Sequence, residues 1–445
     1  MKSKYSIVSG LEALTAIKPN EFRATLLSFI MVFTLMAAYF VLRPVRDAMA
    51  SDWSDSEVSF LWNIQFFVSL ATVSLYGFMV THVRFRAVVP LVYGIFAASF
   101  IAFYLVTPLF SEPILIEKTF YVWVAAFSLF HLSVFWSLMS DTFTKEQGKR
   151  LFSVIAAGAS AGAIVGPLIP VIFAGHLGLQ ALMLIAACGV ILMVPMVFLL
   201  MYLKMRDLRN SNTTTTIPSN PLGGDWWSGF KGVVSNRFLL GIAIFIVLYV
   251  FINAFIYFGQ KNLLADFART DRARILGSID WLVNTLTFIL AFFVTGRVVP
   301  KLGMAFTLTL LPICMVLGML VLAIAPLVVV ILAIQVARRA GNYAVTRPAR
   351  EMLFSQVSKD ERFKAKPVID IVVYRGGDAV SGTVFALLSD GLGLGLAMIA
   401  VVGAGISSVW AALAYRLGLR FDSGEPLDSD TNTARDKLNS IPSIS

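Results

Sequence analysis

Residues 364–378 read Lys-Ala-Lys-Pro-Val-Ile-Asp-Ile-Val-Val-Tyr-Arg-Gly-Gly-Asp, and the apolar run after them continues to about Leu388. At 100° per residue, the polar side chains fall on one helix face and the valines on the other. The polar face holds Asp370, Tyr374, Asp378 and Ser381, with Arg375 at its flank. The apolar face holds Val372, Val373, Val380 and Val384. The pattern predicts an amphipathic helix with a polar seam.

The composition puts this helix in a membrane. Of the 445 residues, 58% are hydrophobic and only 14% are charged, against about 45–50% and about 25% in soluble domains. Many apolar runs reach the ~20 residues that a helix needs to cross a bilayer. We therefore predict an all-α polytopic membrane protein. Buried charge is costly there and rarely idle, which makes the polar seam a candidate functional feature.

Run length and flanking charge predict about twelve membrane spans in two groups of six. The first six are residues 24–49, 58–80, 87–107, 120–140, 151–174 and 180–204. The second six are residues 238–259, 274–295, 302–324, 326–346, 367–389 and 392–416. The predicted domains are an N-terminal six-helix bundle (1–204), a cytoplasmic linker (205–237), a C-terminal six-helix bundle (238–420) and a polar tail (421–445).

The distribution of basic residues predicts the orientation. With both termini in the cytoplasm, the cytoplasmic segments carry 28 of the 36 Lys and Arg residues, and the outside loops carry five. This bias predicts a multi-pass protein of the cell (inner) membrane with that orientation. It also explains the net charge of +10 without nucleic acid as a partner. The basic outside loop Lys261–Arg274 has no explanation in the sequence.

The reactive residues argue against an enzyme. Catalysis would need a nucleophile with its base, paired carboxylates or a metal cluster at the water boundary. The three histidines are scattered, and Cys188 and Cys314 lie in apolar runs. We predict no catalytic residues, no cofactor and no metal. The expected partners are the lipid bilayer and a small anionic substrate; the oligomeric state is unknown, and a monomer is compatible with the sequence.

Span one ends in a charged group. Arg43, Arg46 and Asp47 lie in a sector of about 100° together with Tyr39, and Pro44 lacks a backbone donor and bends helices. One interpretation is an Arg–Asp pair that snorkels to the membrane interface. The other is an anion contact at the outer end of a translocation path.

Two mid-span residues could couple transport to ions. His131 in span four is either a packing residue or a proton relay. Asp280 in span eight needs a partner, which could be Arg43, Arg46 or a coupled cation.

In span five, Gly158, Gly162 and Gly166 recur every fourth residue and predict close helix packing.

Span ten carries a second basic group. Gln335, Arg338, Arg339 and Asn342 share one face. Guanidinium groups bind phosphate oxygens bidentately, and lysines bind them as point charges. The span arginines nearly balance Asp47, Asp280, Asp370 and Asp378, so part of this charge could pair with itself and gate the path. The cytoplasmic side becomes clearly positive only with Arg347, Arg350, Lys364 and Lys366.

Two families share motifs with the chain. The loops after spans two and eight, opened by Gly77 and Gly296, resemble the Gly-x-x-x-Asp-Arg-x-Gly loop of the major facilitator superfamily. Four blocks also look like the ATP/ADP translocase family of nucleotide transporters. They are Leu42-Arg-Pro-Val-Arg-Asp47, Phe135-Trp136 with Lys149-Arg-Leu-Phe152, Arg347-Pro-Ala-Arg-Glu-Met-Leu353, and Lys364-Ala-Lys-Pro-Val-Ile-Asp370 ahead of Arg375 and Asp378.

The resemblance implies a facilitator-like six-plus-six fold and exchange of nucleotides or other phosphorylated anions. Arg46 stands where the family has a basic pathway residue, and Lys364 or Lys366 stands at its basic site before span eleven. Asp280 is similar in position to an acidic residue of span eight. The family's nucleotide carriers have an acidic residue early in span four, whereas residues 120–130 contain neither Asp nor Glu.

We therefore predict a secondary active transporter that works by alternating access. The predicted substrate-binding residues are Arg43, Arg46, Arg338, Arg339, Asn342, Lys364, Lys366 and Arg375. The predicted gating or coupling residues are Asp47, Asp280, Asp370, Asp378 and His131. The alternatives are a proton-coupled facilitator that imports or exports another small metabolite or drug, and a transporter-like sensor without flux.

Overall fold

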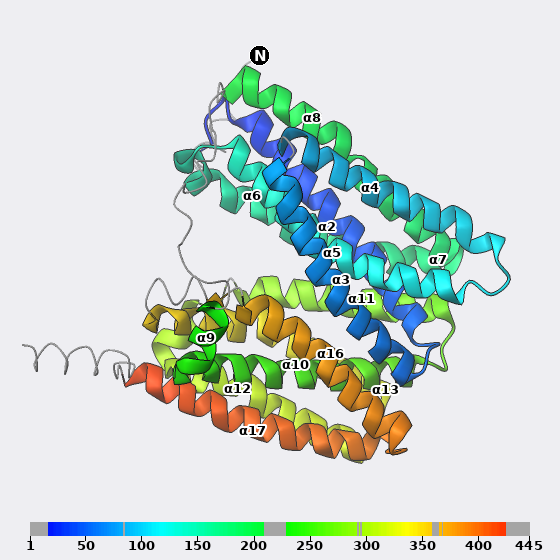
Figure 1. Ribbon diagram of the computed structural model, residues 1–445, viewed down its shortest axis with the longest axis vertical. Helices are drawn as coiled ribbons and strands as arrows, with labels where there is room; N and C mark the ends of the chain where they lie inside the picture. The colour runs from blue at the N-terminus through cyan, green and yellow to red at the C-terminus, as the bar shows by residue number, and fades with distance from the viewer. Residues whose placement is uncertain are drawn as a thin grey trace, which may run out of the picture. The chain divides into compact units, whose positions relative to one another are not determined.

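The computed structural model describes residues 17–82, 85–208, 228–291, 293, 296–357, 365–366 and 368–423. Every regular element within these ranges is a helix, which confirms the all-α prediction. The chain forms two compact units (Figure 1). Unit 1 comprises Met1–Trp53, Phe67–Pro221 and Leu264–Asn284, and unit 2 comprises Ser54–Phe66, Leu222–Leu263 and Thr285–Ser445. Each unit thus contains residues from both predicted halves, and the predicted domain boundaries stay a prediction.

Unit 1 is organised around its first helix. It contains α2 (Phe22–Ala50), most of α3 (Asp55–His82), α4 (Phe85–Val106), α5 (Ile114–Thr142), α6 (Lys145–Val165), α7 (Leu168–Ile191), α8 (Met193–Leu203) and most of α11 (Arg269–Leu290). Helix α2 packs against α5, α6, α7 and α8. Within α7, Gly178 has a φ of 76°, a left-handed conformation that glycine adopts without steric cost. It separates two helical segments.

The glycines of α6 allow that helix to lie directly against α2. A Cβ at Gly158 would lie 2.5 Å from the carbonyl oxygen of Phe29, and one at Gly166 would lie 2.7 Å from Ala37. At Gly162 a Cβ would overlap the carbonyl oxygen of Phe33. The predicted close packing of this stripe is confirmed.

Unit 2 contains the start of α3 and the later helices. They are α9 (Ser228–Ser235), α10 (Arg237–Leu264), α12 (Gly296–Ile324), α13 (Val328–Gly341), α14 (Arg347–Leu353), α16 (Tyr374–Ala386) and α17 (Leu396–Asp422). Across both units, short 3-10 turns lie at Thr107–Leu109 and Phe354–Gln356. The π-helical turns of the two units lie at Lys204–Leu208, Asn342–Thr346, Val368–Val373 and Leu387–Gly391. Helix α12 packs along α17.

The described residues contain ten helical stretches long and apolar enough to cross a membrane. One of them, Lys145–Leu208, has 64 residues and is interrupted at Gly178, so it provides two crossings. Helix α3 has 28 residues, and residues 58–81 within it carry no charged side chain. With these two additions, the helices account for the twelve predicted spans.

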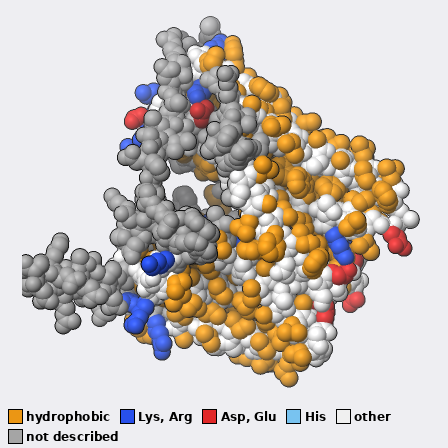
Figure 2. Space-filling model, viewed as in Figure 1, with side chains coloured by type: hydrophobic (Ala, Val, Ile, Leu, Met, Phe, Trp, Pro, Cys, Tyr) orange, Lys and Arg blue, Asp and Glu red, His pale blue; other side chains and the backbone are white. Residues whose placement is uncertain are grey.

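The outer surface of the helices is apolar. On the face shown in Figure 2, hydrophobic side chains follow α4 and α17, and the visible charged side chains gather near helix ends. Leu91 and Leu105 on α4 and Val409 on α17 are exposed. Lipid covers such a surface in a membrane-spanning helix.

Candidate functional site

The charged end of α2 forms an ion-pair cluster in unit 1. Arg46 donates from Nε and Nη2 to Asp47 Oδ1 at 2.9 and 2.7 Å. Arg43 lies 3.9 Å from Asp47 Oδ2, and the Arg46 guanidinium lies 5.0 Å from the centre of the Tyr121 ring. All three charged residues are mostly buried. The Arg–Asp pair of the sequence analysis therefore lies within the helix packing.

Asp280 of α11 joins this cluster. Its Oδ1 lies 3.4 Å from Arg43 Nη1. Arg43 is therefore a partner of the Asp280 carboxylate, which was one of the three predicted possibilities. Two residues hold α11 in place. Asn284 donates to the carbonyl of Ala163 on α6 at 2.8 Å. A Cβ at Gly277 would lie 2.9 Å from the carbonyl oxygen of Pro167, so glycine permits this close approach.

His131 lies one helical turn from the cluster. Its ring stacks on Tyr39 with 4.7 Å between ring centres, and Tyr39 precedes Arg43 by four residues on α2. The imidazole is buried. Its nitrogens make no hydrogen bond of normal geometry with the described residues, only weaker approaches to the carbonyls of Phe127 and Ser128. An aromatic packing role and a proton-relay role both fit this environment.

The unexplained basic loop of the sequence analysis forms a second network in unit 1. Arg269 donates to both oxygens of Glu117 at 2.6 and 3.1 Å and to Asp52 Oδ2 at 2.5 Å. Arg272 donates to Asp52 Oδ1 at 2.5 Å and to the carbonyl of Ala48 at 3.2 Å. We call Asp52, Glu117, Arg269 and Arg272 the loop network. It ties the start of α11 to α2 and α5.

In unit 2, another residue of the basic loop pairs with the start of α3. Lys261 Nζ lies 2.8 Å from Asp55 Oδ1, and the two side chains are only 4% and 5% exposed. Asn262 donates to Asp55 Oδ2 at 2.9 Å. The loop's positive charge is thus largely neutralised by acidic residues close to helix ends, in unit 1 and in unit 2.

A third group, on α13 of unit 2, has a different character. Arg338 donates from Nε and Nη2 to Gln335 Oε1 at 3.2 and 2.6 Å, and from Nη1 to the Tyr249 hydroxyl at 2.9 Å. Arg338 and Arg339 are both buried. No carboxylate of the described residues lies within 4 Å of Arg338. The Asn342 backbone N–H caps α13 by donating to the carbonyls of Arg338 and Arg339.

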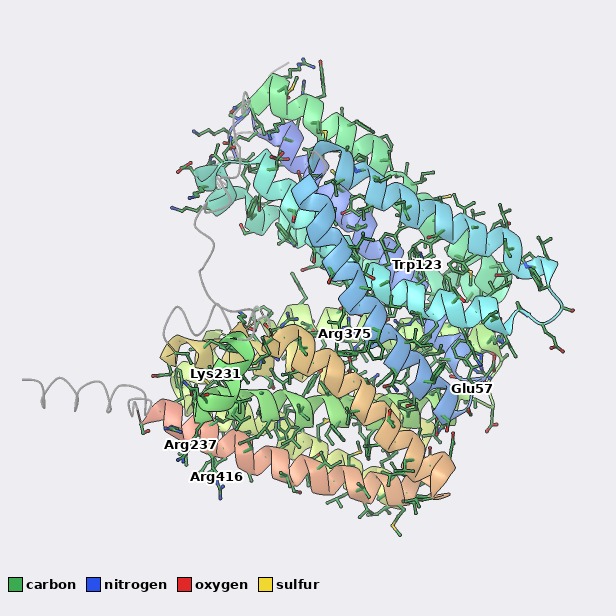
Figure 3. The ribbon with its side chains drawn as sticks, viewed as in Figure 1. Glu57, Trp123, Lys231, Arg237, Arg375 and Arg416 are labelled. Atoms are coloured by element: carbon green, nitrogen blue, oxygen red, sulfur yellow. The ribbon has the colours of Figure 1, made fainter. Side chains whose placement is uncertain are left out.

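The end of the polar seam at Ser381 lies in the interior of unit 2. Ser381 is fully buried, whereas Val380 beside it is 55% exposed, which confirms the predicted division of the faces at these residues. Arg375, near the start of α16 (Figure 3), lies 3.5 Å from Asp378. The stretch is not one α-helix throughout, because Val368–Val373 is a π-helical turn.

A fourth group lies where α14 meets that π-helical turn. Arg350 lies 3.5 Å from Asp370 and 3.3 Å from Glu351. Lys366 Nζ lies 2.5 Å from Glu351 Oε2 and 5.6 Å from the centre of the Phe354 ring. Lys364 lies outside the described residues.

The structure therefore gathers most of the predicted site residues into two sets. Unit 1 brings together Arg43, Arg46, Asp47, Asp280 and, through Tyr39, His131. Unit 2 holds Arg338, Arg339, Asn342, Lys366, Asp370, Arg375 and Asp378. Sequence reasoning missed Tyr249, Glu351 and the acidic partners of the basic loop. The available signal for the loop was that Asp52, Asp55 and Glu117 lie in or beside the predicted outside loops.

Comparisons with known proteins agree with this architecture. The family model of the Major Facilitator Superfamily matches residues 28–362. A search of curated protein sequences finds no match.

Solved structures match over most of the chain. The nucleoside transporter NupG has 14% identity and a TM-score of 0.65, covering 90% of this chain and 99% of its own. A bacterial homologue of the iron transporter ferroportin, in an inward-facing state, has 12% identity and a TM-score of 0.64, covering 89% and 99%. A bacterial homologue of the human lysosomal transporter Spinster has 13% identity and a TM-score of 0.62, covering 92% and 99%. At these identities the likeness shows the fold alone.

Proposed function

Because this chain belongs to the Major Facilitator Superfamily and is therefore a membrane transporter, we propose that it is a secondary active transporter that exchanges a phosphorylated anion. The proposed mechanism is alternating access, and a nucleotide of the ATP/ADP type is the substrate that we favour. The single observation that carries the proposal is the buried positive charge of Arg338, whose hydrogen-bond acceptors are both neutral.

The cost of burying a charge explains why this observation points to an anion. A guanidinium without a counter-charge is expensive in a low-dielectric interior. A ligand that supplies the negative charge during part of the transport cycle would offset the cost of burying this guanidinium. We propose that the other predicted substrate-binding residues, Arg43, Arg46, Arg339, Asn342, Lys364, Lys366 and Arg375, also contact the anion during transport.

The carboxylates have a separate proposed role. Asp47, Asp280, Asp370 and Asp378 each lie within 4 Å of an arginine. An arriving anion competes with these carboxylates for the guanidinium groups, so we propose that the pairs exchange partners during transport. The motif blocks that resemble the ATP/ADP translocase family support a nucleotide as that anion.

The Lys and Arg distribution supports a proposed orientation. We propose that both termini lie in the cytoplasm and that the protein resides in the cell (inner) membrane. Single cysteines at Ser3 and Ser423, labelled by a membrane-impermeant maleimide, should react only after the cells are permeabilised. Labelling at both positions in intact cells would show that both termini lie outside the cell membrane and would contradict the proposed orientation.

Exchange in proteoliposomes tests the function. The purified protein is reconstituted into vesicles loaded with unlabelled ADP, and uptake of labelled ATP is followed. Uptake should depend on internal ADP and should be absent from vesicles loaded with buffer and from protein-free vesicles. Equal uptake with and without an internal nucleotide, or no uptake at all, would exclude nucleotide exchange.

His131 favours one alternative, a proton-coupled facilitator for another small metabolite or drug. Its buried ring lies beside Tyr39, one turn from the Arg43–Asp280 pair. In that case an imposed pH gradient drives flux into vesicles that contain no counter-substrate, and His131→Gln abolishes the response to the gradient. Exchange that is unaffected by His131→Gln would argue for the packing role.

A further inference from the structure

Arg338 has hydrogen-bond donors that no described residue uses. A guanidinium has five N–H groups. Gln335 takes one from Nε and one from Nη2, and Tyr249 takes one from Nη1. One N–H therefore remains on each of the two terminal nitrogens. No hydrogen bond to a described residue uses these two N–H groups. Two N–H groups on neighbouring nitrogens bind a carboxylate or phosphate bidentately when they point in the same direction.

Tyr249 adds a third donor at the same place. Its hydroxyl accepts from Arg338, so its own proton is available to another acceptor. The tyrosine is held by packing, because its ring lies 5.8 Å from the ring of Trp410 and is only 6% exposed. The Gln335 oxygen fixes the opposite edge of the guanidinium. Arg338 is thus held in place before a ligand arrives.

An aromatic wall adjoins these donors. The rings of Tyr249 and Tyr374 lie 6.5 Å apart at 47°. Tyr374, unlike Tyr249, is partly exposed, so part of its surface is accessible. A tilted aromatic pair of this kind offers a face against which a planar ring packs favourably.

The surrounding charges also favour an anion. Asp378 lies close enough to Arg338 for a Coulombic interaction, but its ion pair within 4 Å is with Arg375. Arg339 is the next residue of α13 and interacts electrostatically with Tyr249. Arg338 and Arg339 thus both act electrostatically on Tyr249, and Asp378 acts on both tyrosines. The positive charge of Arg338, which has no described carboxylate within 4 Å, favours an anionic ligand.

We propose that Arg338, Tyr249 and Tyr374 form the subsite for a phosphate group attached to a planar ring, with Arg338 and the Tyr249 hydroxyl on the phosphate oxygens and Tyr374 on the ring. This assignment rests on the proposed function, since it takes the ligand to be the transported anion. It narrows the substrate class to a nucleoside phosphate rather than a sugar phosphate or inorganic phosphate.

Calorimetric binding to the purified full-length protein in nanodiscs tests the subsite without any transport. The four probes are AMP, ribose 5-phosphate, inorganic phosphate and adenosine. We expect AMP to bind most tightly. Because charged hydrogen bonds are lost, Arg338→Gln should weaken AMP binding roughly 10- to 100-fold. Tyr249→Phe, which keeps the ring, should weaken it by a smaller factor. Tyr374→Leu should weaken AMP but leave ribose 5-phosphate unchanged.

A matched arginine controls for charge and folding. Arg416 of α17 is exposed (Figure 3), and Arg416→Gln should bind AMP as the wild type does. Should Arg338→Gln fail to fold, Tyr249→Phe and Tyr374→Leu still decide the matter. Unchanged AMP affinity in Arg338→Gln, or in both tyrosine variants, would overturn the subsite.

The outcomes separate the subsite from the function. Binding of AMP that depends on Arg338, without nucleotide exchange in vesicles, would support the subsite and overturn the exchange function. Exchange that persists in Arg338→Gln would support the function and overturn the subsite. If the wild-type protein binds none of the four probes, the subsite is wrong.

Discussion

The loop network and the Arg338 group use the same side chain in opposite ways. In the loop network, Arg269 and Arg272 are bound by the carboxylates of Asp52 and Glu117 at 2.5–3.1 Å. Arg338 is held by the neutral oxygens of Gln335 and Tyr249. The first arrangement is complete, because each guanidinium has its counter-charge. The second has no carboxylate of the described residues within 4 Å, and in our proposal that difference separates a structural arginine from a ligand-binding one.

Stability measurements can sharpen this distinction, because the two arrangements respond differently to loss of one charge. Removing one partner of a buried ion pair leaves an unpaired charge and destabilises the protein strongly. Removing a buried charge that has no counter-charge relieves the interior of a cost. The next three predictions test that contrast, in order of decreasing destabilisation.

The largest effect is expected at the buried pair of Lys261 and Asp55. Asp55→Asn removes the carboxylate that pairs with the buried Lys261 ammonium, so it should lower the free energy of unfolding by about 3–5 kcal/mol. Chemical or thermal unfolding in detergent measures this. The control is the double variant Asp55→Asn/Lys261→Gln, which removes both charges and should recover part of the loss. A double variant less stable than the single one would show that the ion pair is not what Asp55 contributes.

A smaller loss is expected in the loop network. Glu117→Gln removes a bidentate partner of Arg269, but that guanidinium is 41% exposed and keeps Asp52. The destabilisation should therefore be about 1–3 kcal/mol. Glu112→Gln, just before α5, is the control, since Glu112 is exposed and its substitution should not change the stability measurably. Equal melting temperatures for the two variants would mean that the network contributes no stability.

At Arg338 the expected change in stability is close to zero or favourable. Arg338→Gln removes a buried charge that has no carboxylate of the described residues within 4 Å. The free energy of unfolding should therefore fall by about 1 kcal/mol or less, or rise. Arg272→Gln is the comparison in the loop network and should destabilise, because Asp52 loses a partner. A loss at Arg338 as large as that at Arg272 would erase the distinction between the two regions.

Sequence periodicity predicted the features that depend on neighbours along one helix. The glycine stripe of α6 and the division of faces at Val380 and Ser381 are of this kind, because a helix repeats every 3.6 residues whatever surrounds it. The partner of Asp280 was narrowed to three possibilities, since a deep carboxylate needs a counter-charge and span one offered two arginines.

Pairs that join distant parts of the chain were not predictable in this way. Arg269 and Asp52 are 217 positions apart, and nothing local to Arg269 indicates which acid it meets. The role of Tyr249 has the same origin, since it pairs with Arg338 across 89 positions. A single-helix pattern marks a residue as polar, and only the packing of other helices decides whether it is neutralised.

The last prediction concerns a pair with one partly exposed member, Glu21 and Arg150. Arg150 donates to both Glu21 oxygens at 2.8 and 3.1 Å. Burial alone would raise the pKa of Glu21, but the hydrogen bonds from Arg150 and from the Lys18 backbone outweigh it and lower the pKa below its ordinary value. A lowered carboxylate pKa contributes stability that is present above the unfolded value of about 4.3 and is lost as the pH falls through the folded value.

The pH dependence of Glu21→Gln tests this sign. Near pH 7 the variant should be less stable than the wild type by about 0.5–1 kcal/mol, because Arg150 is partly exposed and solvent screens the pair. Since the wild-type carboxylate becomes protonated at low pH, the difference should shrink below pH 4. Melting temperatures of both proteins between pH 3.5 and 7.5 provide the measurement. A difference that grows on acidification would mean that Glu21 is protonated more readily in the folded protein than in the unfolded chain.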